Sequence, residues 1–257
     1  MGSPLAGALA KVARAEEHLQ ALDEALTRWT IGASATLTGE KNDERTEFRF
    51  YVEYDPLPDP VRWALLIGDT VHNLRAALDH VVYECSETSA RDRCEFPIFI
   101  DRKEFVGHLY KIRGIKNPDV RALLEAAQPW QVPLKPLDHH LWIIQRLDID
   151  DKHKLLVPVA LFPRGLSAHV KVTYPSPPSA GTAYELGIEQ PIALEQHALL
   201  ATVRVPQPAV EVLLELDLQV GVGIRLEGSR PRGVTETLGE LCRYTRRLIE
   251  QIRDELG

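Results

Sequence analysis

Hydrophobic residues recur every three or four positions near the start of the chain, which is the spacing of an amphipathic helix. Between residues 4 and 29 they are separated by alanine and charged residues that favour helix; the apolar positions are Leu5, Leu9, Val12, Leu19, Leu22 and Leu26. The pattern predicts a long helix over residues 4–29. Gly32 and a polar stretch at 39–45 then end it.

A strictly alternating segment follows and predicts a half-buried strand at 46–54, because Phe48, Phe50 and Val52 fall on one face. Prolines at positions 56, 58 and 60 form a rigid connector, and Pro60 suits the first turn of a helix. The amphipathic pattern then resumes and predicts a helix at 60–85, with a core face made of Trp63, Ile67, Leu74, Leu78 and Val81.

Helical patterns continue to about residue 160 and return at the end of the chain. We expect helices at 101–110, 118–127, 137–156 and 235–256, with Asn117 and Asp138 as N-caps. Short runs rich in Val and Leu predict antiparallel strands at 169–174, 183–188, 198–205 and 210–226. The predicted fold is a single α+β domain, a helical bundle with a C-terminal antiparallel β-sheet. Its helical part is 1–160, its β-rich part is 161–230 and its returning helix is 235–256.

Composition adds limits on the class of protein. The 257 residues carry a net charge of -7 and are 44% hydrophobic, as in an ordinary globular protein. That charge argues against a dominant, sequence-blind attraction to nucleic acid or anionic membranes. No apolar run approaches the roughly 20 residues that span a bilayer, and no signal peptide is recognisable. We therefore expect a cytoplasmic protein without a membrane partner.

The second face of the helix at 60–85 carries short polar and aromatic side chains in place of long charged ones. We call this face the polar stripe; its members are Asp69, His72, Asn73, Ala76, His80 and Tyr83. Local helix propensity does not explain it, since Asp, Asn and His are poor helix formers. One interpretation is a hydrogen-bonded seam between packed helices. The other is a functional cleft, with a binding surface made of Asp69, His72, Asn73, Asp79 and Tyr83.

Metal binding is one chemistry that this face suits, because imidazole and carboxylate groups in a helical bundle hold iron, manganese or zinc in other proteins. The facing helix at 137–156 contributes further candidate groups. The predicted ligands are Asp69, His72, His80, Asp148, Asp151 and His153. The spacing of these residues matches no HExxH or paired ExxH pattern. If they do bind a metal, the protein is a metal-dependent oxidoreductase or hydrolase.

The second chemistry needs no metal. Arg75 and His80 are separated by four residues, and this spacing resembles the signature of the HEPN superfamily of small helical proteins. The resemblance implies a metal-independent endoribonuclease of defence or toxin type, without a cofactor, acting on RNA as a homodimer. By position, Arg75 would bind the phosphate and His80 would act as acid and base. Arg75 and Asp79, four residues apart, are also expected to form an ion pair.

A third possibility is a non-catalytic ligand-binding or interaction protein in which the polar stripe is only a seam. The C-terminal region also contains a group of arginines, interpreted as a solvated helix face or as a phosphate-binding rim: Arg225, Arg230, Arg232, Arg243, Arg246 and Arg247. No nucleophile elbow, P-loop or dinucleotide fingerprint is present, so serine hydrolases, nucleoside triphosphatases and Rossmann enzymes are not expected.

Overall fold

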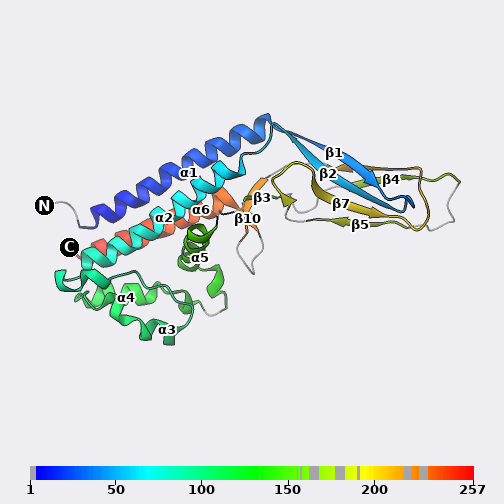
Figure 1. Ribbon diagram of the computed structural model, residues 1–257. Helices are drawn as coiled ribbons and strands as arrows, with labels where there is room; N and C mark the ends of the chain where they lie inside the picture. The colour runs from blue at the N-terminus through cyan, green and yellow to red at the C-terminus, as the bar shows by residue number, and fades with distance from the viewer. Residues whose placement is uncertain are drawn as a thin grey trace.

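The computed structural model is a mixed α/β structure with a helical end and a β-rich end (Figure 1). It describes residues 4–132, 134–154, 156, 158–161, 168–176, 183–189, 192–216, 221–225 and 231–257. All pairings between the described strands are antiparallel. The coarse prediction of helices and antiparallel sheets in one chain is therefore confirmed. Among the described residues, none of the helices combines the length and apolar character needed to cross a membrane.

Two long antiparallel helices, α1 (Ala6–Gly32) and α2 (Pro60–Cys85), are the main elements of the helical end. They confirm the helices predicted at 4–29 and 60–85. The start of α2 follows from local chemistry, because Asp59 caps it by accepting a hydrogen bond from the backbone N–H of Arg62. Two further helices pack on this pair: α6 (Val234–Asp254) packs on α1 and α2, and α5 (His140–His153) packs on α2 and α6.

The largest sheet contains strands from both halves of the chain, in the order β1-β2-β7-β5. Its strands are β1 (Ser34–Lys41), β2 (Glu47–Asp55), β5 (Glu185–Ile188) and β7 (Ala198–Arg204). The strand predicted at 46–54 is confirmed as β2. The prediction of a purely C-terminal sheet is wrong, because the hairpin of β1 and β2 is inserted between α1 and α2 and pairs with β7.

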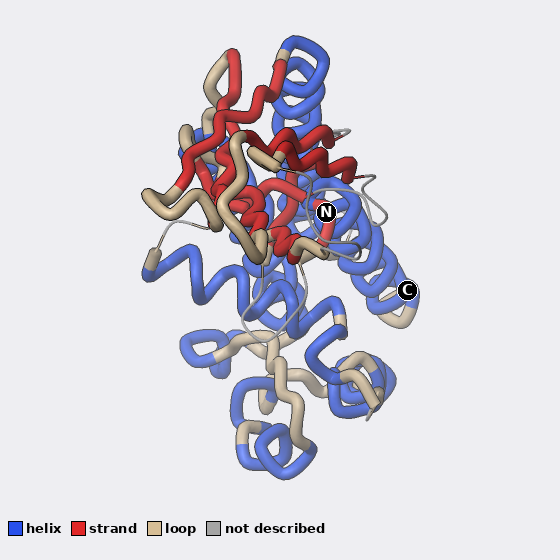
Figure 2. Tube along the Cα trace, turned by 90° about the vertical axis from the view of Figure 1, so that its right-hand side faces the viewer, coloured by secondary structure: helices blue, strands red, loops and turns tan. Residues whose placement is uncertain are grey.

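The remaining strands form two smaller sheets, seen from the β-rich end in Figure 2. One has the order β10-β9-β3-β6, built from β3 (Pro158–Leu161), β6 (Ile192–Ala193), β9 (Gly221–Ile224) and β10 (Arg232–Gly233). The other pairs β4 (Ala168–Thr173) with β8 (Glu211–Leu216). The strand-rich run predicted at 210–226 thus contains two strands in different sheets, β8 and β9, with residues 217–220 and 226 outside the described part.

The connection from α2 to α5 is a run of short helices. These are η1 (Thr88–Arg93), α3 (Arg102–Gly107), η2 (Leu109–Ile112), α4 (Pro118–Ala126), η3 (Pro129–Gln131) and η4 (Pro136–Asp138). Asn117 caps α4 as predicted, accepting hydrogen bonds from two backbone N–H groups. The prediction of Asp138 as the cap of α5 is wrong, because α5 begins at His140 and the cap is His139. The intervening proline at 136 supports a separate turn of 3₁₀ helix that contains Asp138.

Aromatic rings join the helical end to the sheet. The rings of Trp29 and Trp63 pack edge-on with centroids 5.2 Å apart, and Trp29 also contacts the ring of Tyr54 on β2 at 5.7 Å. The indole N–H of Trp29 donates a hydrogen bond to the carbonyl of Pro56, 3.0 Å away. Because Trp29 contacts both α2 and β2, burial of these rings holds the helical hairpin and the sheet together.

Candidate functional site

The polar stripe of α2 lies along the edges where α1 and α5 meet this helix. Asp69 approaches His18 of α1, with 3.9 Å between Oδ2 and Nδ1. His80 is exposed beside Gly7 of α1, where an added Cβ would lie 3.3 Å from Nδ1 of the imidazole. His72 instead contacts α5. The stripe therefore does not face one common cleft, since its members are divided between two neighbouring helices.

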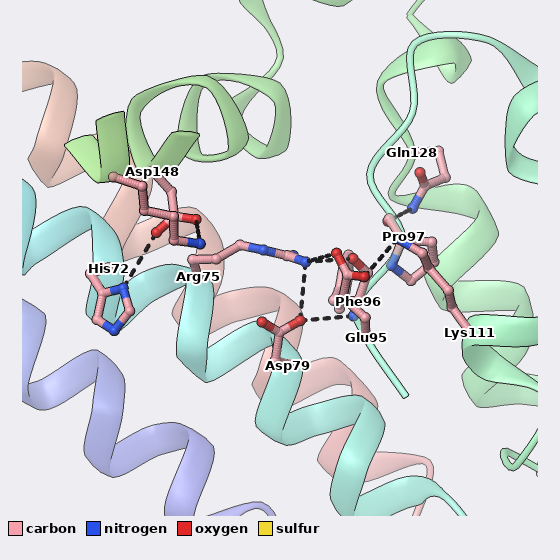
Figure 3. Close-up of polar contacts among 10 residues, drawn as sticks. His72, Arg75, Asp79, Glu95, Phe96, Pro97, Lys111, Gln128 and Asp148 are labelled. Carbon is pink, nitrogen blue, oxygen red and sulfur yellow. Dashed lines mark hydrogen bonds and ion pairs between the residues drawn. The ribbon is translucent and has the colours of Figure 1, made fainter. Parts of the chain in front are cut away.

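The strongest polar constellation is formed where His72 of α2 meets α5 (Figure 3). Nδ1 of His72 lies 3.4 Å from Oδ1 of Asp148. The other carboxylate oxygen of Asp148 accepts a hydrogen bond from Nζ of Lys152, 2.6 Å away. Asp148 is only 2% exposed, whereas the side chain of His72 is 61% exposed. A buried carboxylate thus orients an imidazole that is open to solvent.

Asp151 completes this group, and we refer to His72, Asp148, Asp151 and Lys152 as the α2–α5 cluster. The carboxylate of Asp151 packs directly on the backbone of Gly68, where there is no room for a side chain. Burial raises the pKa of Asp151, and the nearby charges of Asp148 and Asp69 raise it further, against an opposing effect of His72. The cluster therefore contains an oriented imidazole and a carboxyl group that protonates more readily than an ordinary aspartic acid.

Arg75 serves a different part of the molecule. Its guanidinium is 5% exposed and points toward the segment after η1, away from His72 (Figure 3). Nη2 donates to Oε1 of Glu95 at 2.9 Å and to the carbonyl of Phe96 at 3.0 Å. The predicted ion pair with Asp79 is confirmed, at 3.1 Å. In this chain the guanidinium is already surrounded by protein groups and is not presented to a phosphate.

The carboxylates around Arg75 form a buried network that fixes the backbone at 95–96. Asp79 accepts a hydrogen bond from the backbone N–H of Phe96 at 2.9 Å, although burial raises its pKa. Glu95 is also partly buried, which by itself would raise its pKa. A hydrogen bond from Lys111, with the positive charges of Lys111 and Arg75, lowers that pKa below its usual value. The network therefore favours the charged form of Glu95, whereas burial disfavours that of Asp79, and both side chains hold α2 to this segment through Arg75 and the backbone of Phe96.

Arg75 and His80 do not converge within one chain. Arg75 contacts residues 95–96, whereas His80 lies against Gly7 of α1. Two other predicted binding residues also have local partners. Nδ2 of Asn73 donates to the backbone carbonyl of Asp69 within α2, and the ring of Tyr83 is covered by the guanidinium of Arg91, 4.7 Å from its centroid.

The six predicted metal ligands do not form one donor set. Among the described residues, no three or more His, Cys, Asp or Glu side chains are grouped so that they could hold a metal ion. Both oxygens of Asp148 already face basic side chains, and the ammonium of Lys152 opposes a cation at this position. His153 is exposed at the last residue of α5. The arrangement therefore does not fit iron, manganese or zinc.

Sequence reasoning missed three residues that shape this region. Lys152 follows Asp148 by four positions on α5, a spacing that signals an ion pair. Gly68 lies inside α2, where a glycine is costly unless another group approaches closely. Gln128 gives no such signal, because its partners are backbone groups distant in sequence.

No family model, curated protein or solved structure matches this chain.

Proposed function

We propose that this protein is a HEPN-like, metal-independent ribonuclease whose acid–base group is His72 rather than His80. The observation that carries the proposal is the contact of the exposed imidazole of His72 with the buried carboxylate of Asp148. A carboxylate that accepts a hydrogen bond from Nδ1–H fixes the tautomer in which Nε2 is basic. An imidazole oriented in this way is placed to act as a general base.

The remaining members of the cluster have roles that follow from their charge. Nε2 of His72 removes the proton of a ribose 2′-hydroxyl, and that oxygen attacks the adjacent phosphorus. The bond from phosphorus to the 5′-oxygen breaks, and that oxygen takes its proton from Asp151, the carboxyl group of the cluster whose pKa is raised by burial. The products are a 2′,3′-cyclic phosphate and a free 5′-hydroxyl. Lys152 is the cation nearest to the imidazole and carboxylate pair and stabilises the negative charge on phosphorus.

RNA as the substrate rests on the resemblance in the segment from Arg75 to His80. The proposal changes the roles that the resemblance implies, since the guanidinium of Arg75 is buried among protein groups. Arg75 then acts as a positioning residue that fixes α2. The homodimer that the resemblance implies remains a prediction, which multi-angle light scattering of the purified protein measures directly.

The test is cleavage of a fluorescently labelled RNA in the presence of EDTA by variants purified in parallel. We expect His72→Asn to lower the rate by at least 100-fold and Asp148→Asn by roughly 10- to 100-fold, as when a general base or the group orienting it is lost. His80→Asn is the control, because it replaces another histidine on the same helix. Its cleavage rate should stay within about twofold of the wild-type rate.

Three results would contradict the proposal. RNA that remains intact with the wild-type protein would remove the ribonuclease function altogether. A rate unaffected by His72→Asn would show that the α2–α5 cluster is not the site. A rate abolished by His80→Asn but not by His72→Asn would return the acid–base role to the residue that the resemblance first indicated.

A further inference from the structure

A second concave region lies along α6, outside the α2–α5 cluster. It consists of two adjoining lobes that share Arg247 in their walls, and we call it the α6 groove. The polar lobe has a volume of about 430 Å³ and is lined by Asp138, His140, Ile143, Arg232, Thr237, Glu240, Leu241, Arg243 and Arg247. The apolar lobe has a volume of about 310 Å³ and is lined by residues of α4 and α6, including Leu123, Ala127, Tyr244 and Leu248.

Three arginines and two carboxylates, Asp138 and Glu240, line the polar lobe, which leaves it with a small excess of positive charge on a protein whose net charge is -7. Arg243 and Arg247 are four residues apart on α6 and therefore project from the same side of the helix. Neither guanidinium has a carboxylate partner within ion-pair distance among the described residues; the Nε–H of Arg247 donates to the backbone carbonyl of Arg243 at 3.3 Å. Arg232, in contrast, is paired with Asp138. Two guanidinium groups are thus available to bind an anion.

The two lobes meet at a pair of stacked rings. The imidazole of His140 lies parallel to the ring of Tyr244, with centroids 4.7 Å apart and an angle of 8° between their planes. Burial lowers the pKa of His140, and the charges of Arg247 and Arg232 lower it further against an opposing effect of Glu240. His140 is therefore mainly neutral at pH 7. Its ring adds a flat polar surface between the arginines and the apolar lobe.

We infer that the α6 groove binds a nucleoside monophosphate, with its phosphate on Arg243 and Arg247 and its planar base in the apolar lobe beside Tyr244. The arginines supply charge-assisted hydrogen bonds to phosphate oxygens. The aromatic and aliphatic wall of the other lobe favours a flat ring system over a flexible chain. Each lobe has the volume of a small-ligand site. This inference uses none of the residues of the α2–α5 cluster and does not rest on the proposed function.

Isothermal titration calorimetry of the full-length protein tests the inference with three probes: adenosine 5′-monophosphate, adenosine and inorganic phosphate. We expect the nucleotide to bind at least tenfold more tightly than either fragment, because only the nucleotide occupies both lobes. Arg247→Gln and Arg243→Gln should each weaken nucleotide binding by at least tenfold. Arg246→Gln is the matched control, since Arg246 is the neighbour on α6 that pairs with Glu16; it should change the affinity by less than twofold.

The inference would be overturned if the nucleotide gave no heat of binding. It would also be overturned if adenosine or inorganic phosphate bound as tightly as the nucleotide. Equal weakening by Arg246→Gln and Arg247→Gln would show a diffuse charge effect in place of a site. Thermal melts of each variant confirm that it is folded. His72→Asn should bind the nucleotide normally, so a failure of this inference is distinguishable from a failure of the ribonuclease proposal.

Discussion

The carboxylate of Asp151 occupies the space that a side chain at Gly68 would need. The two residues come from α5 and α2, and their contact lets these helices approach closely beside His72. A glycine inside a helix costs about 1 kcal/mol relative to alanine, so its presence in α2 follows from this packing. Because of this contact, replacing Gly68 even with alanine should change the stability of the protein.

Gly68→Ala should therefore destabilise the protein by about 1–3 kcal/mol, the usual cost of overpacking, despite the better helix propensity of alanine. Urea denaturation measures the change. Gly107→Ala on α3 is the control, because an added Cβ there meets nothing within 4 Å, and its stability should be unchanged or higher. Equal stability of Gly68→Ala and the wild type would mean that Asp151 moves aside without cost.

Arg75→Leu should destabilise the protein by roughly 1–3 kcal/mol, since it leaves the buried carbonyl of Phe96 unpaired and removes the partner of two half-exposed carboxylates, Asp79 and Glu95. Arg62→Ala, an exposed arginine on the same helix, should change the free energy of unfolding by less than about 0.5 kcal/mol. Chemical denaturation of both variants measures the difference. If Arg75→Leu is as stable as the wild type, the guanidinium does not hold the segment at 95–96.

Gln128→Ala should cost roughly 2–4 kcal/mol. The side chain of Gln128 is fully buried and forms hydrogen bonds with the carbonyls of Pro97 and Leu124 and with the backbone N–H of Phe99. Truncation leaves these groups without partners, and each buried unpaired group costs about 1–3 kcal/mol. Gln131→Ala, which removes one exposed hydrogen bond, is the control for denaturation experiments and should be nearly neutral.

Acid should weaken the fold through His139. Its Nδ1 accepts the capping hydrogen bond from the backbone N–H of Leu141, 3.3 Å away, and cannot do so when protonated. Burial, with a smaller effect of His140, lowers the pKa of His139 from 6.5 to about 4. Between these values the unfolded chain binds more protons than the folded chain, so stability rises with pH and is lost as the pH falls from 6.5 toward 4.

His139→Asn keeps a capping side chain that does not titrate. As the pH falls from 7 to 4.5, the wild type should therefore lose more unfolding free energy than this variant.

For His197→Asn, the difference in unfolding free energy from the wild type should change with pH in the opposite direction. The hydrogen bond that His197 donates to the carboxylate of Glu53 raises the pKa of His197, so its stabilisation is present below pH 6.5 and lost as the pH rises through the folded pKa. Parallel slopes for the two variants would contradict the assignment for His139.

The sequence predicted the elements that have local signals. Pro60 and the cap at Asp59 define the start of α2, and alternation defines β2. Strand β1 was missed, because its sequence, SATLTGEK, has mostly exposed or half-buried positions without alternating large hydrophobic residues. The insertion of the β1 and β2 hairpin into a sheet with β7 depends on contacts more than 140 residues apart in the chain, which no local pattern reveals.

The candidate site divides in the same way. The helical patterns placed Asp148 among the candidate groups on the helix facing the polar stripe, and the structure brings it to His72. The shared motif of Arg75 and His80 gave no information on burial, and the structure places these side chains against different neighbours. The polar stripe was treated as one surface because its members share a face of α2. In the folded chain α1 and α5 divide that face between them.

The chain runs from α1 into β1 through the single residue Ala33, and from β2 into α2 through a four-residue, proline-containing link. Trp29 contacts both Tyr54 and Trp63, so the helical hairpin and the β hairpin meet at one cluster of aromatic rings. Because both chain crossings are this short, the two hairpins cannot separate without disrupting the packing of these rings. The orientation of the sheet relative to the helices is thus set at one small junction.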